Sequence, residues 1–433
     1  MSDWIERSLA QLISPLETGK RPAGGVSADT EGVPSIGGEN IDAAGKMSYS
    51  NVNRISPAYA HLMKKGKLKS GDTLINKDGA QTGKVAQYDG QFADAWINEH
   101  VFIVRPDPGK IDAGYLFYSM LDGRAQNQIA RRITGSAQPG LNSDFAKAVT
   151  LRLPRDIKLQ AKIADILRLL DVQIEATEAL ITKQERVRAG LMQDLFTRGI
   201  DEHGQLRPSR DEAPQLYNRT DLGWLPLGWE AARLVNLTSR IVDGVHHTPT
   251  YVPHGVPFVT VKSLTAGRGI DTRQGNFITL SDHHVFQMRA DPRAGDVLVS
   301  KDGTLGVARY VDETVEEFSI FVSVAMLRPI TSLLNPAFLC EFFRTRFYEA
   351  QMGYLSAGSG LKHIHLEHFR KFVLPRPDLS EQAKILSILD AADQSIVRLE
   401  DMLRKLRLQK AGLLQDLLTG EVSVPSLLES AAA

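Results

Sequence analysis

The strongest constraint on the fold is that the chain repeats itself once. Segments of the first half return in the same order in the second half, and Gly71 and Gly295 begin matching stretches 224 residues apart. That offset is far longer than the roughly 20–50 residues of a solenoid repeat. Each repeat is therefore a complete module. The matching segments are GVP at 32–34 and 255–257, GD at 71–72 and 295–296, RP at 105–106 and 328–329, GLN at 140–142 and GLK at 360–362, LPR at 153–155 and 374–376, QAKI at 160–163 and 382–385, and GLMQDLFT at 190–197 and GLLQDLLT at 412–419.

Each module ends in a stretch with the periodicity of a coiled coil. Apolar residues recur there at alternating steps of four and three, a spacing that indicates a helix with one continuous apolar seam. Only Lys410 interrupts the seam of the second copy, whereas the first copy is more polar toward its middle. The residues that we expect to pair the helices are Ile163, Leu167, Leu170, Ile174, Ile181, Leu191 and Leu195 in the first copy, and Ile385, Leu389, Ile396, Leu399, Leu403, Leu406, Leu413 and Leu417 in the second.

One such helix cannot bury its seam alone, but two copies in one chain can bury each other. Each helix is about 40 residues and so about 60 Å long, at ~1.5 Å per residue. If the modules are related by a two-fold axis, the helices run antiparallel and the globular parts lie at opposite ends of a rigid spacer. The alternative is that each helix packs only on its own domain.

The globular parts show strand and helix patterns together. Strand-like stretches such as DTLINKDG and VFIVRP return as DVLVSKDG and SVAMLRP, and each part has one expected helix, AGYLFYSMLDGRAQNQIA or PAFLCEFFRTRFYEAQM. We therefore predict two similar α+β domains, an internal pseudo-two-fold duplication and two long antiparallel coiled-coil helices. The expected bounds are a first domain at 1–153, a central helical spacer at 154–199, a polar linker at 200–225, a second domain at 226–376, a distal helical spacer at 377–420 and a C-terminal tail at 421–433.

Composition indicates a protein of the cytoplasm. The chain has 433 residues, and its 42% hydrophobic and 24% charged residues are typical of globular proteins. One cysteine, Cys340, excludes an intramolecular disulfide. The N-terminus does not have the pattern of a signal peptide, and no apolar stretch is long enough to span a membrane. The 51 basic and 51 acidic residues balance, which argues against general coating of nucleic acid but leaves room for a basic patch on one face.

The stretch GDTLINKDGAQTGK at 71–84 has some features of a phosphate-binding loop. Three residues rather than four separate Gly79 from Gly83, and Val85 stands where such a loop needs Ser or Thr to hold Mg²⁺. We therefore interpret this stretch, and its second copy VSKDGTLGVAR, as strand–turn–strand units.

Other catalytic motifs are incomplete. NPAF at 335–338 lacks the second proline of an adenine-methyltransferase loop and is expected to begin a helix, and the nuclease-like residues at 377–384 have the wrong spacing. Eight of the 11 histidines lie in the second module, where His363 and His365 could be drawn as zinc ligands, but no Cys-x-x-Cys or His-Glu-x-x-His motif accompanies them. We expect no catalytic site and no metal site.

In order and in duplicate, these motifs resemble the DNA-specificity subunit of type I restriction–modification systems. The carriers are the two GD-x-L-[IV]-[NS]-K-D-G turns, the Gly-Ser loops at 135–154 and 358–375, LPLGWE at 225–230 and the helices from QAKI to QDL. The resemblance implies two target-recognition domains, each reading one half of an asymmetric split DNA sequence, with the helices fixing the gap. It also implies that two modification subunits dock on the helices and that restriction subunits join them. S-adenosylmethionine would bind the modification subunits, and no cofactor or catalytic role is implied for this chain.

The turns and Gly-Ser loops supply the candidate DNA contacts. Lys and Arg side chains there could contact phosphates, and Gln or Asn could read adenine in the major groove. The alternative is that these are merely solvated polar turns. At the level of the whole protein, the alternatives are a coiled-coil adaptor joining two protein-binding domains and, with less support, a methyltransferase or restriction enzyme. The candidate contacts are Lys64, Lys65, Lys77, Gln81, Thr82, Lys84, Gln138 and Asn142 in the first module, and Lys301, Thr304, Arg309, Lys362 and His363 in the second.

Overall fold

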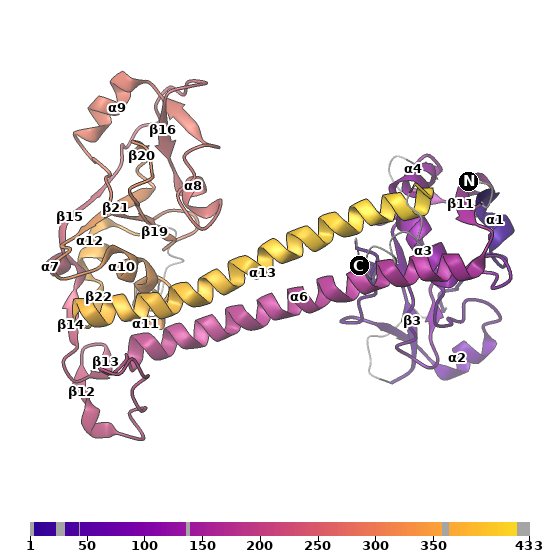
Figure 1. Ribbon diagram of the computed structural model, residues 1–433, viewed down its shortest axis with the longest axis horizontal. Coiled ribbons are helices and arrows are strands. Elements are labelled where there is room, and N and C mark those ends of the chain that lie inside the picture. The colour runs from indigo at the N-terminus through magenta and orange to yellow at the C-terminus, as the bar shows by residue number, and fades with distance from the viewer. Residues whose placement is uncertain (1–3, 23–30, 43, 136–138, 357–362, 422–433) are drawn as a thin grey trace, which may run out of the picture. The chain divides into compact units, whose positions relative to one another are not determined.

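The structure is a computed structural model that describes residues 4–22, 31–42, 44–135, 139–356 and 363–421. It divides into unit 1, residues 1–179 and 400–433, and unit 2, residues 180–399. Each unit contains one globular lobe together with parts of two 41-residue helices, α6 (Ile157–Thr197) and α13 (Leu379–Thr419) (Figure 1). We call the globular parts lobe 1, residues 4–156, and lobe 2, residues 198–378.

Lobe 1 is built around two small sheets. A four-stranded antiparallel sheet has the order β2-β8-β5-β6, and a three-stranded sheet has the order β4-β3-β7, with β3 parallel to β7. A third pairing, β1 with β11, brings the two ends of the lobe together. The bounds are β1 Trp4–Ser8, α1 Leu9–Leu12, β2 Glu17–Thr18, β3 Val33–Ile36, η1 Gly38–Asn40, β4 Asn53–Ile55, α2 Pro57–Leu62, β5 Thr73–Asn76, β6 Val85–Gln87, β7 Trp96–Ile97, β8 Val101–Val104, α3 Ala113–Leu121, α4 Gly123–Ala130, β9 Ile133–Thr134, β10 Gly140–Leu141, α5 Phe145–Ala148 and β11 Thr150–Pro154.

Lobe 2 repeats this topology. Its sheets have the orders β15-β21-β18-β19 and β17-β16-β20, again with one parallel pair, and β14 pairs with β22. The predicted duplication is therefore confirmed strand by strand. The bounds are η2 Pro214–Leu216, β12 Tyr217–Thr220, β13 Gly223–Pro226, β14 Glu230–Arg233, α7 Leu234–Leu237, β15 Thr238–Asp243, β16 Val256–Val259, α8 Val261–Thr265, β17 Asn276–Ile278, α9 Leu280–Gln287, β18 Val297–Ser300, β19 Ala308–Tyr310, β20 Ser319–Ile320, β21 Val324–Pro329, α10 Pro336–Phe342, α11 Arg346–Ser356, α12 Leu366–Lys371 and β22 Val373–Arg376.

Two of the repeated sequence motifs form one buried ion pair in each lobe. Arg105 donates from Nε and Nη2 to the two carboxylate oxygens of Asp72, at 2.8 and 2.7 Å. Arg328 and Asp296 repeat this forked contact at 2.8 and 2.9 Å. Because both aspartates are buried, each depends on its arginine for charge compensation. The GD and RP motifs thus occur together in both lobes because they form this ion pair.

The helix expected near the end of each domain is in fact two helices. Asp122 ends α3 and has an extended backbone, and its carboxylate accepts a hydrogen bond from the N–H of Arg124 to cap α4. In lobe 2 the hydroxyl of Thr345 lies in the matching break between α10 and α11. The apolar pattern continues across both breaks, so periodicity alone predicted single helices.

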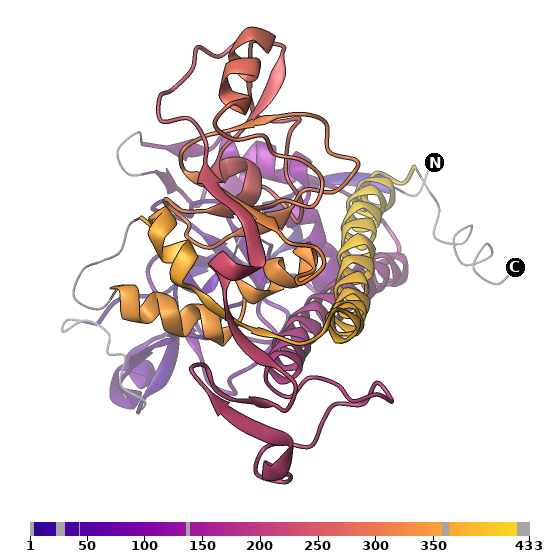
Figure 2. The same cartoon turned by 90° about the vertical axis from the view of Figure 1, so that its left-hand side faces the viewer.

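The two long helices run antiparallel within each unit (Figures 1 and 2). In unit 1, Asp171 and Glu178 of α6 form ion pairs with Lys410 and Arg407 of α13, so one residue number rises as the other falls. In unit 2 the seam residues Leu195 and Ile385 belong to one core cluster. The residues predicted to pair the helices are all buried or half-buried, and several of them also pack into the cores of the lobes: Ile163, Leu167, Leu170, Ile174, Ile181, Leu191, Leu195, Ile385, Leu389, Ile396, Leu399, Leu403, Leu406, Leu413 and Leu417.

Local contacts define the ends of the two long helices. Gly199 and Gly420 follow the helices with φ of 62° and 73°, the left-handed conformation of glycines that end helices. At the start of α13, a carboxylate oxygen of Asp378 accepts a hydrogen bond from the N–H of Glu381. Within the described residues, no helix has the length and apolar character needed to cross a membrane.

The segment predicted as a linker is folded as part of unit 2. Strands β12 and β13 form a hairpin, and Leu225 at its end is fully buried in the core of lobe 2. The carboxylate of Glu381 anchors this region, because it accepts hydrogen bonds from the N–H of Ile200, the guanidinium of Arg207 and the indole of Trp229. The turn-forming residues of this segment had suggested a loop, but they instead connect short elements that lie against the start of α13.

Candidate nucleic-acid interface

The KDG turn of lobe 1 connects β5 to β6. Asn76 closes the turn, since its N–H donates to the carbonyl of Lys84 at 2.9 Å and its carbonyl accepts from Gly83 at 2.8 Å. The N–H of Leu141, at the end of the Gly-Ser loop, donates to the carbonyl of Lys77 at 2.6 Å. A phosphate-binding loop is followed by a helix, whereas this turn is followed by a strand, so the strand–turn–strand interpretation is confirmed.

Lobe 2 places the same two segments together between β18 and β19. The N–H of Ile364 donates to the carbonyl of Lys301 at 2.8 Å, as that of Leu141 does to Lys77. The structure therefore matches Leu141 with Ile364. The pairing of GLN at 140–142 with GLK at 360–362 in the sequence was three residues out of register. In both lobes the KDG turn and the end of the Gly-Ser loop form one composite surface.

The two turn lysines have opposite surroundings. The Nζ of Lys77 is half-buried and lies 5.6 Å from the ring centroid of Phe102, and no described carboxylate is within ion-pair distance of it. Lys301 is only 3% exposed, and its Nζ lies 3.0 Å from Oδ2 of Asp243. Lys301 is thus neutralised inside the lobe, which corrects the expectation that it is placed to contact a phosphate.

Asp243, which sequence reasoning missed, organises this part of lobe 2. It lies at the end of β15, is 4% exposed on its side chain and contacts Arg289, Lys301 and His246. Burial alone would raise the pKa of Asp243, but hydrogen bonds from these three residues outweigh burial and lower that pKa. The signal available in the sequence was an acidic residue at the end of a strand that contains β-branched residues. Nothing in the spacing between Asp243 and Lys301 indicated that these two residues would pair.

The other candidates in lobe 1 fall into two groups. The exposed residues are Lys64, Lys65, Gln81 and Asn142, and Lys84 is half-buried. Thr82 instead turns its hydroxyl inward to the carbonyls of Gly79 and Pro139, at 2.6 and 3.2 Å, and so joins the turn to the Gly-Ser loop. Gln138 lies outside the described residues.

Of the other candidates in lobe 2, only Thr304 is fully exposed. His363 is half-buried and its Nδ1 pairs with the carboxylate of Asp302. The equivalent Asp78 of lobe 1 also pairs with a histidine, at 2.6 Å, but this is His100, which precedes β8. Arg309 is also half-buried, and burial, followed by the nearby charge of Arg344, lowers the pKa of its guanidinium. Lys362 lies outside the described residues.

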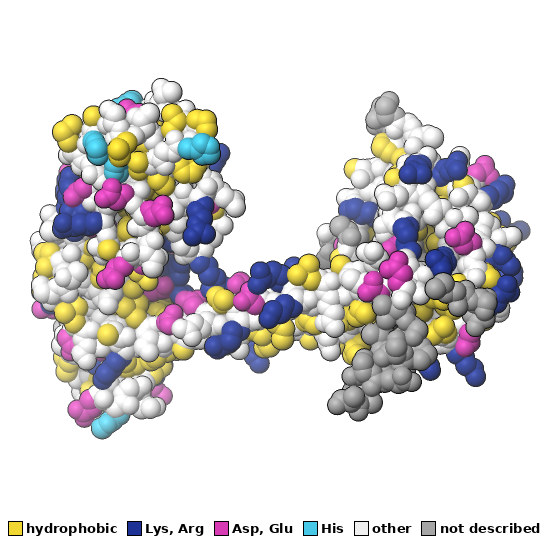
Figure 3. Space-filling view, turned by 45° about the horizontal axis from the view of Figure 1, so that its top comes forward, with side chains coloured by type: hydrophobic (Ala, Val, Ile, Leu, Met, Phe, Trp, Pro, Cys, Tyr) yellow, Lys and Arg dark blue, Asp and Glu magenta, His cyan; other side chains and the backbone are white. Residues whose placement is uncertain are grey.

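Figure 3 shows one face of the molecule with its side chains coloured by type. On this face, histidines gather on lobe 2, and Lys and Arg side chains are spread over both lobes and the helices. The described part of the chain holds no group of three or more His, Cys, Asp or Glu side chains that could hold a metal ion.

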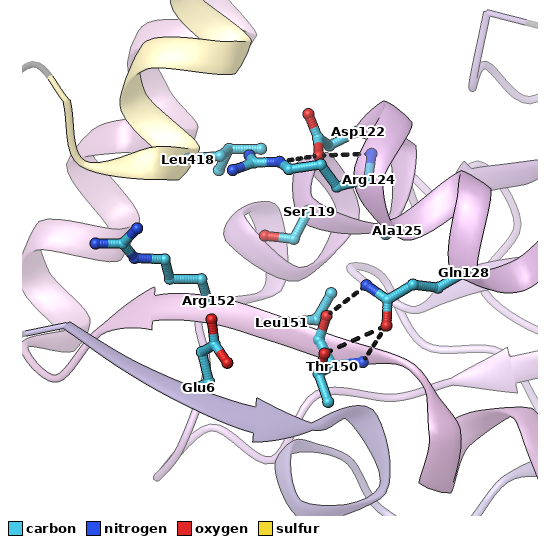
Figure 4. A pocket seen from close by; sticks show the side chains of 10 residues that line it. All are labelled: Glu6, Ser119, Asp122, Arg124, Ala125, Gln128, Thr150, Leu151, Arg152 and Leu418. Atoms are coloured by element: carbon cyan, nitrogen blue, oxygen red, sulfur yellow. Dashed lines mark hydrogen bonds and ion pairs between the residues drawn. The ribbon is translucent and has the colours of Figure 1, made fainter.

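A small polar pocket lies away from the turns, where the end of α13 meets lobe 1 (Figure 4). It has a volume of about 210 Å³ and is lined by Ser119, Arg124, Arg152 and Leu418 among others. One wall is closed by Gln128, whose side chain makes two hydrogen bonds, at 2.8 and 3.0 Å, with the backbone of Thr150. Gln351 and Val373 repeat this clamp in lobe 2 at 2.8 and 2.8 Å, so it serves the framework.

The structure thus has two lobes of the same sheet topology and two long helices that run antiparallel within each unit (Figure 1). The model of the type I restriction modification DNA specificity domain matches residues 1–186 and 249–407. The chain therefore belongs to this family, and its role is that of a type I restriction–modification specificity subunit.

Relatives and solved structures agree with this assignment. A putative type I restriction enzyme MjaX specificity subunit from Methanocaldococcus jannaschii is 23% identical, covering 98% of this chain and 94% of its own. A chain solved in work on complex assembly and conformational transition of the type I restriction–modification system matches with a TM-score of 0.60 and 18% identity, covering 98% of this chain and 99% of its own. The S subunit of M. genitalium matches with a TM-score of 0.56 and 17% identity over 96% of each chain.

We expect Lys77→Ala to weaken binding to every duplex by a similar factor. A lysine at a phosphate supplies affinity without sequence information, and losing one contact should lower the slope of log affinity against log salt by about 1. Titration of labelled duplexes at several salt concentrations measures this. A loss restricted to one target sequence would show that Lys77 reads a base.

Proposed function

We propose that each lobe reads one half of a bipartite, asymmetric DNA target and that the helix pair fixes the gap between the halves. The observation that carries this proposal is the duplicated composite surface of KDG turn and Gly-Ser loop, presented on one framework in both lobes. Two readers in one polypeptide impose a spacing rule, as dimeric repressors do with their half-sites. Unlike the readers of a homodimer, they can also diverge.

The divergence of the two surfaces supports an asymmetric target. Lobe 1 carries exposed lysines at 64 and 65 and has the half-buried Lys77, whereas lobe 2 buries Lys301 and surrounds its turn with histidine. Phosphate contacts position a protein and base contacts specify the sequence, so surfaces this different should read different bases. Among the exposed candidates, Gln81 and Asn142 have the side-chain chemistry that pairs bidentately with adenine.

We further propose that this chain contributes no catalytic group and works in the cytoplasm. In this proposal two modification subunits dock on the helical regions, bind S-adenosylmethionine and methylate an adenine flipped from the duplex. Restriction subunits join that core. The long helices α6 and α13 support docking, because large apolar side chains remain exposed on them, including Leu169 at 59% and Leu408 at 68%.

Exchange of one lobe tests the proposal. Lobe 2, residues 198–378, would be replaced by the corresponding lobe of a relative, the chain would be expressed with its modification subunits, and methylated sites would be mapped across the host genome. We expect the half of the target read by lobe 1 to be kept and only the other half to change. Methylation of an unchanged target would refute the division between lobes, and an absence of DNA binding by the native complex would favour a protein-binding adaptor.

A further inference from the structure

The seam of the helix pair carries a charged residue at one place in each unit, and the two places are equivalent. Arg188 of α6 and Lys410 of α13 occupy the same seam position, 222 residues apart. Each meets an aspartate of the other helix, since Arg188 pairs with Asp393 and Lys410 with Asp171. Asp171 and Asp393 are also 222 residues apart, so the two ion pairs exchange under the internal pseudo-two-fold relation.

A third group, from the lobe, completes each contact. In unit 2, Glu341 of α10 accepts a hydrogen bond from Nη2 of Arg188 at 2.9 Å. In unit 1, Tyr118 of α3 donates its hydroxyl to Oδ2 of Asp171 at 2.8 Å. Each cluster therefore joins α6, α13 and a lobe helix. We call them junction 1, formed by Tyr118, Asp171 and Lys410, and junction 2, formed by Glu341, Arg188 and Asp393.

The hydrogen bonds of junction 2 depend on the direction in which the groups approach, whereas the contacts of the apolar seam do not. Nε and Nη2 of Arg188 donate to both carboxylate oxygens of Asp393 at 2.7 Å, the forked geometry that fixes the plane and angle of approach. Apolar side chains attract without regard to direction and repack when neighbours shift. The forked contact therefore adds a preferred direction to the packing of the lobe helix on the two long helices.

Placing charges at this depth has a cost that apolar residues would avoid. The side chain of Arg188 is 11% exposed and that of Glu341 is 13% exposed. Buried ion pairs are often no more stabilising than apolar residues of similar volume, and their best-attested benefit is to specify one arrangement. Both copies of the module have kept a polar cluster here although its residues differ. The position is therefore maintained for geometry.

We propose that junctions 1 and 2 set the orientation of each reading lobe on the helix pair and thereby decide which gap between half-sites is accepted. This inference rests on the proposed function. Adding one base pair to the gap moves a half-site by about 3.4 Å along the duplex and turns it by about 35°, since ~10.5 base pairs make one turn. A lobe that has lost its junction should follow such a change more easily than a lobe that is held there.

The test replaces junction 2 by apolar side chains of similar size, Arg188→Met, Glu341→Met and Asp393→Leu together. Methylation by the complex with its modification subunits is measured on duplexes with the native gap and with gaps one base pair shorter or longer. Binding to a duplex carrying only the half-site of lobe 2 is measured in parallel. We expect half-site binding and the unfolding midpoint to be kept, while preference for the native gap falls about tenfold, the size of one ordinary recognition contact.

Two further variants make the outcome decisive. Ile396→Leu changes an apolar seam residue of the same unit and should leave the gap preference unaltered. Arg188→Lys with Glu341→Tyr gives junction 2 the residue types of junction 1 and should restore the preference lost in the apolar variant. An unchanged gap preference in the apolar variant would overturn the proposal. Failure of the native complex to methylate any split target would instead count against the proposed function.

Discussion

Gly244→Ala should destabilise lobe 2 by about 3 kcal/mol or more, because the added methyl group has no space. Gly244 follows β15 where the chain passes directly over β20. A Cβ there would lie 1.9 Å from the carbonyl oxygen of Ile320 and 2.3 Å from its carbon. Both neighbours are backbone atoms of a strand, so no side-chain rotation relieves the clash. The two sheets of lobe 2 would have to separate at this crossing.

Lobe 1 offers the matched variant. Gly19 follows β2, and a Cβ there would lie 1.7 Å from the carbonyl oxygen of Ile97 in β7. We expect Gly19→Ala to affect lobe 1 as Gly244→Ala affects lobe 2. Hydrogen exchange should localise each effect, with lost protection in β16 and β20 for one variant and in β3 and β7 for the other.

Gly267→Ala is the control for these two substitutions. No atom lies within 4 Å of the position that its Cβ would take. Its unfolding midpoint should match that of the unsubstituted chain. An unchanged midpoint and unchanged exchange in Gly244→Ala would mean that the two sheets of lobe 2 do not cross at this glycine.

The fold was largely predictable because each half of the duplicated sequence could be compared with the other half. The apolar seam from Ile385 to Leu417 predicted one long helix, and the other copy of the seam predicted its partner helix. Motifs such as GD and RP marked equivalent points of the two lobes. Details that depend on a few polar atoms were not predictable. The breaks at Asp122 and Thr345 lie inside unbroken apolar patterns, and only the capping hydrogen bonds reveal them.

The sequence predicted which segments carry the candidate contacts, but not the surroundings of the turn lysines. In each lobe the KDG turn lies against the residues that follow the Gly-Ser loop, yet Lys77 and Lys301 have different neighbours. Lys77 follows β5, in a sheet whose edge strand β2 ends in Thr18, whereas Lys301 contacts Asp243 at the end of the equivalent edge strand β15. Whether the turn lysine is paired with a carboxylate therefore depends on a residue nearly 60 positions away, and local sequence patterns do not contain that information.

This contrast predicts different results for the two turn lysines. Lys301→Met removes the ammonium that lies closest to the buried carboxylate of Asp243. We expect it to destabilise lobe 2 by about 3 kcal/mol. This value is at the lower end of the range for breaking a buried ion pair, because Arg289 and His246 still contact Asp243. Lys77→Met should leave the free energy of unfolding nearly unchanged. Denaturant unfolding of both variants measures the difference. A neutral Lys301→Met would show that the ammonium of Lys301 contributes nothing to the lobe.

The penalty in Lys301→Met should also depend on pH in a defined direction. In the native lobe the lowered pKa of Asp243 stabilises the fold above the unfolded value of about 3.9, and this contribution is lost as pH falls through the lower folded pKa. Without Lys301, protonation removes the uncompensated charge, so the difference between variant and native chain should shrink as the pH falls below about 4. Asp243→Asn combined with Lys301→Met is the control. It should be less destabilised at pH 7 than Lys301→Met, and its stability should lack the part of the pH dependence that comes from Asp243, because no buried carboxylate remains at this position to titrate.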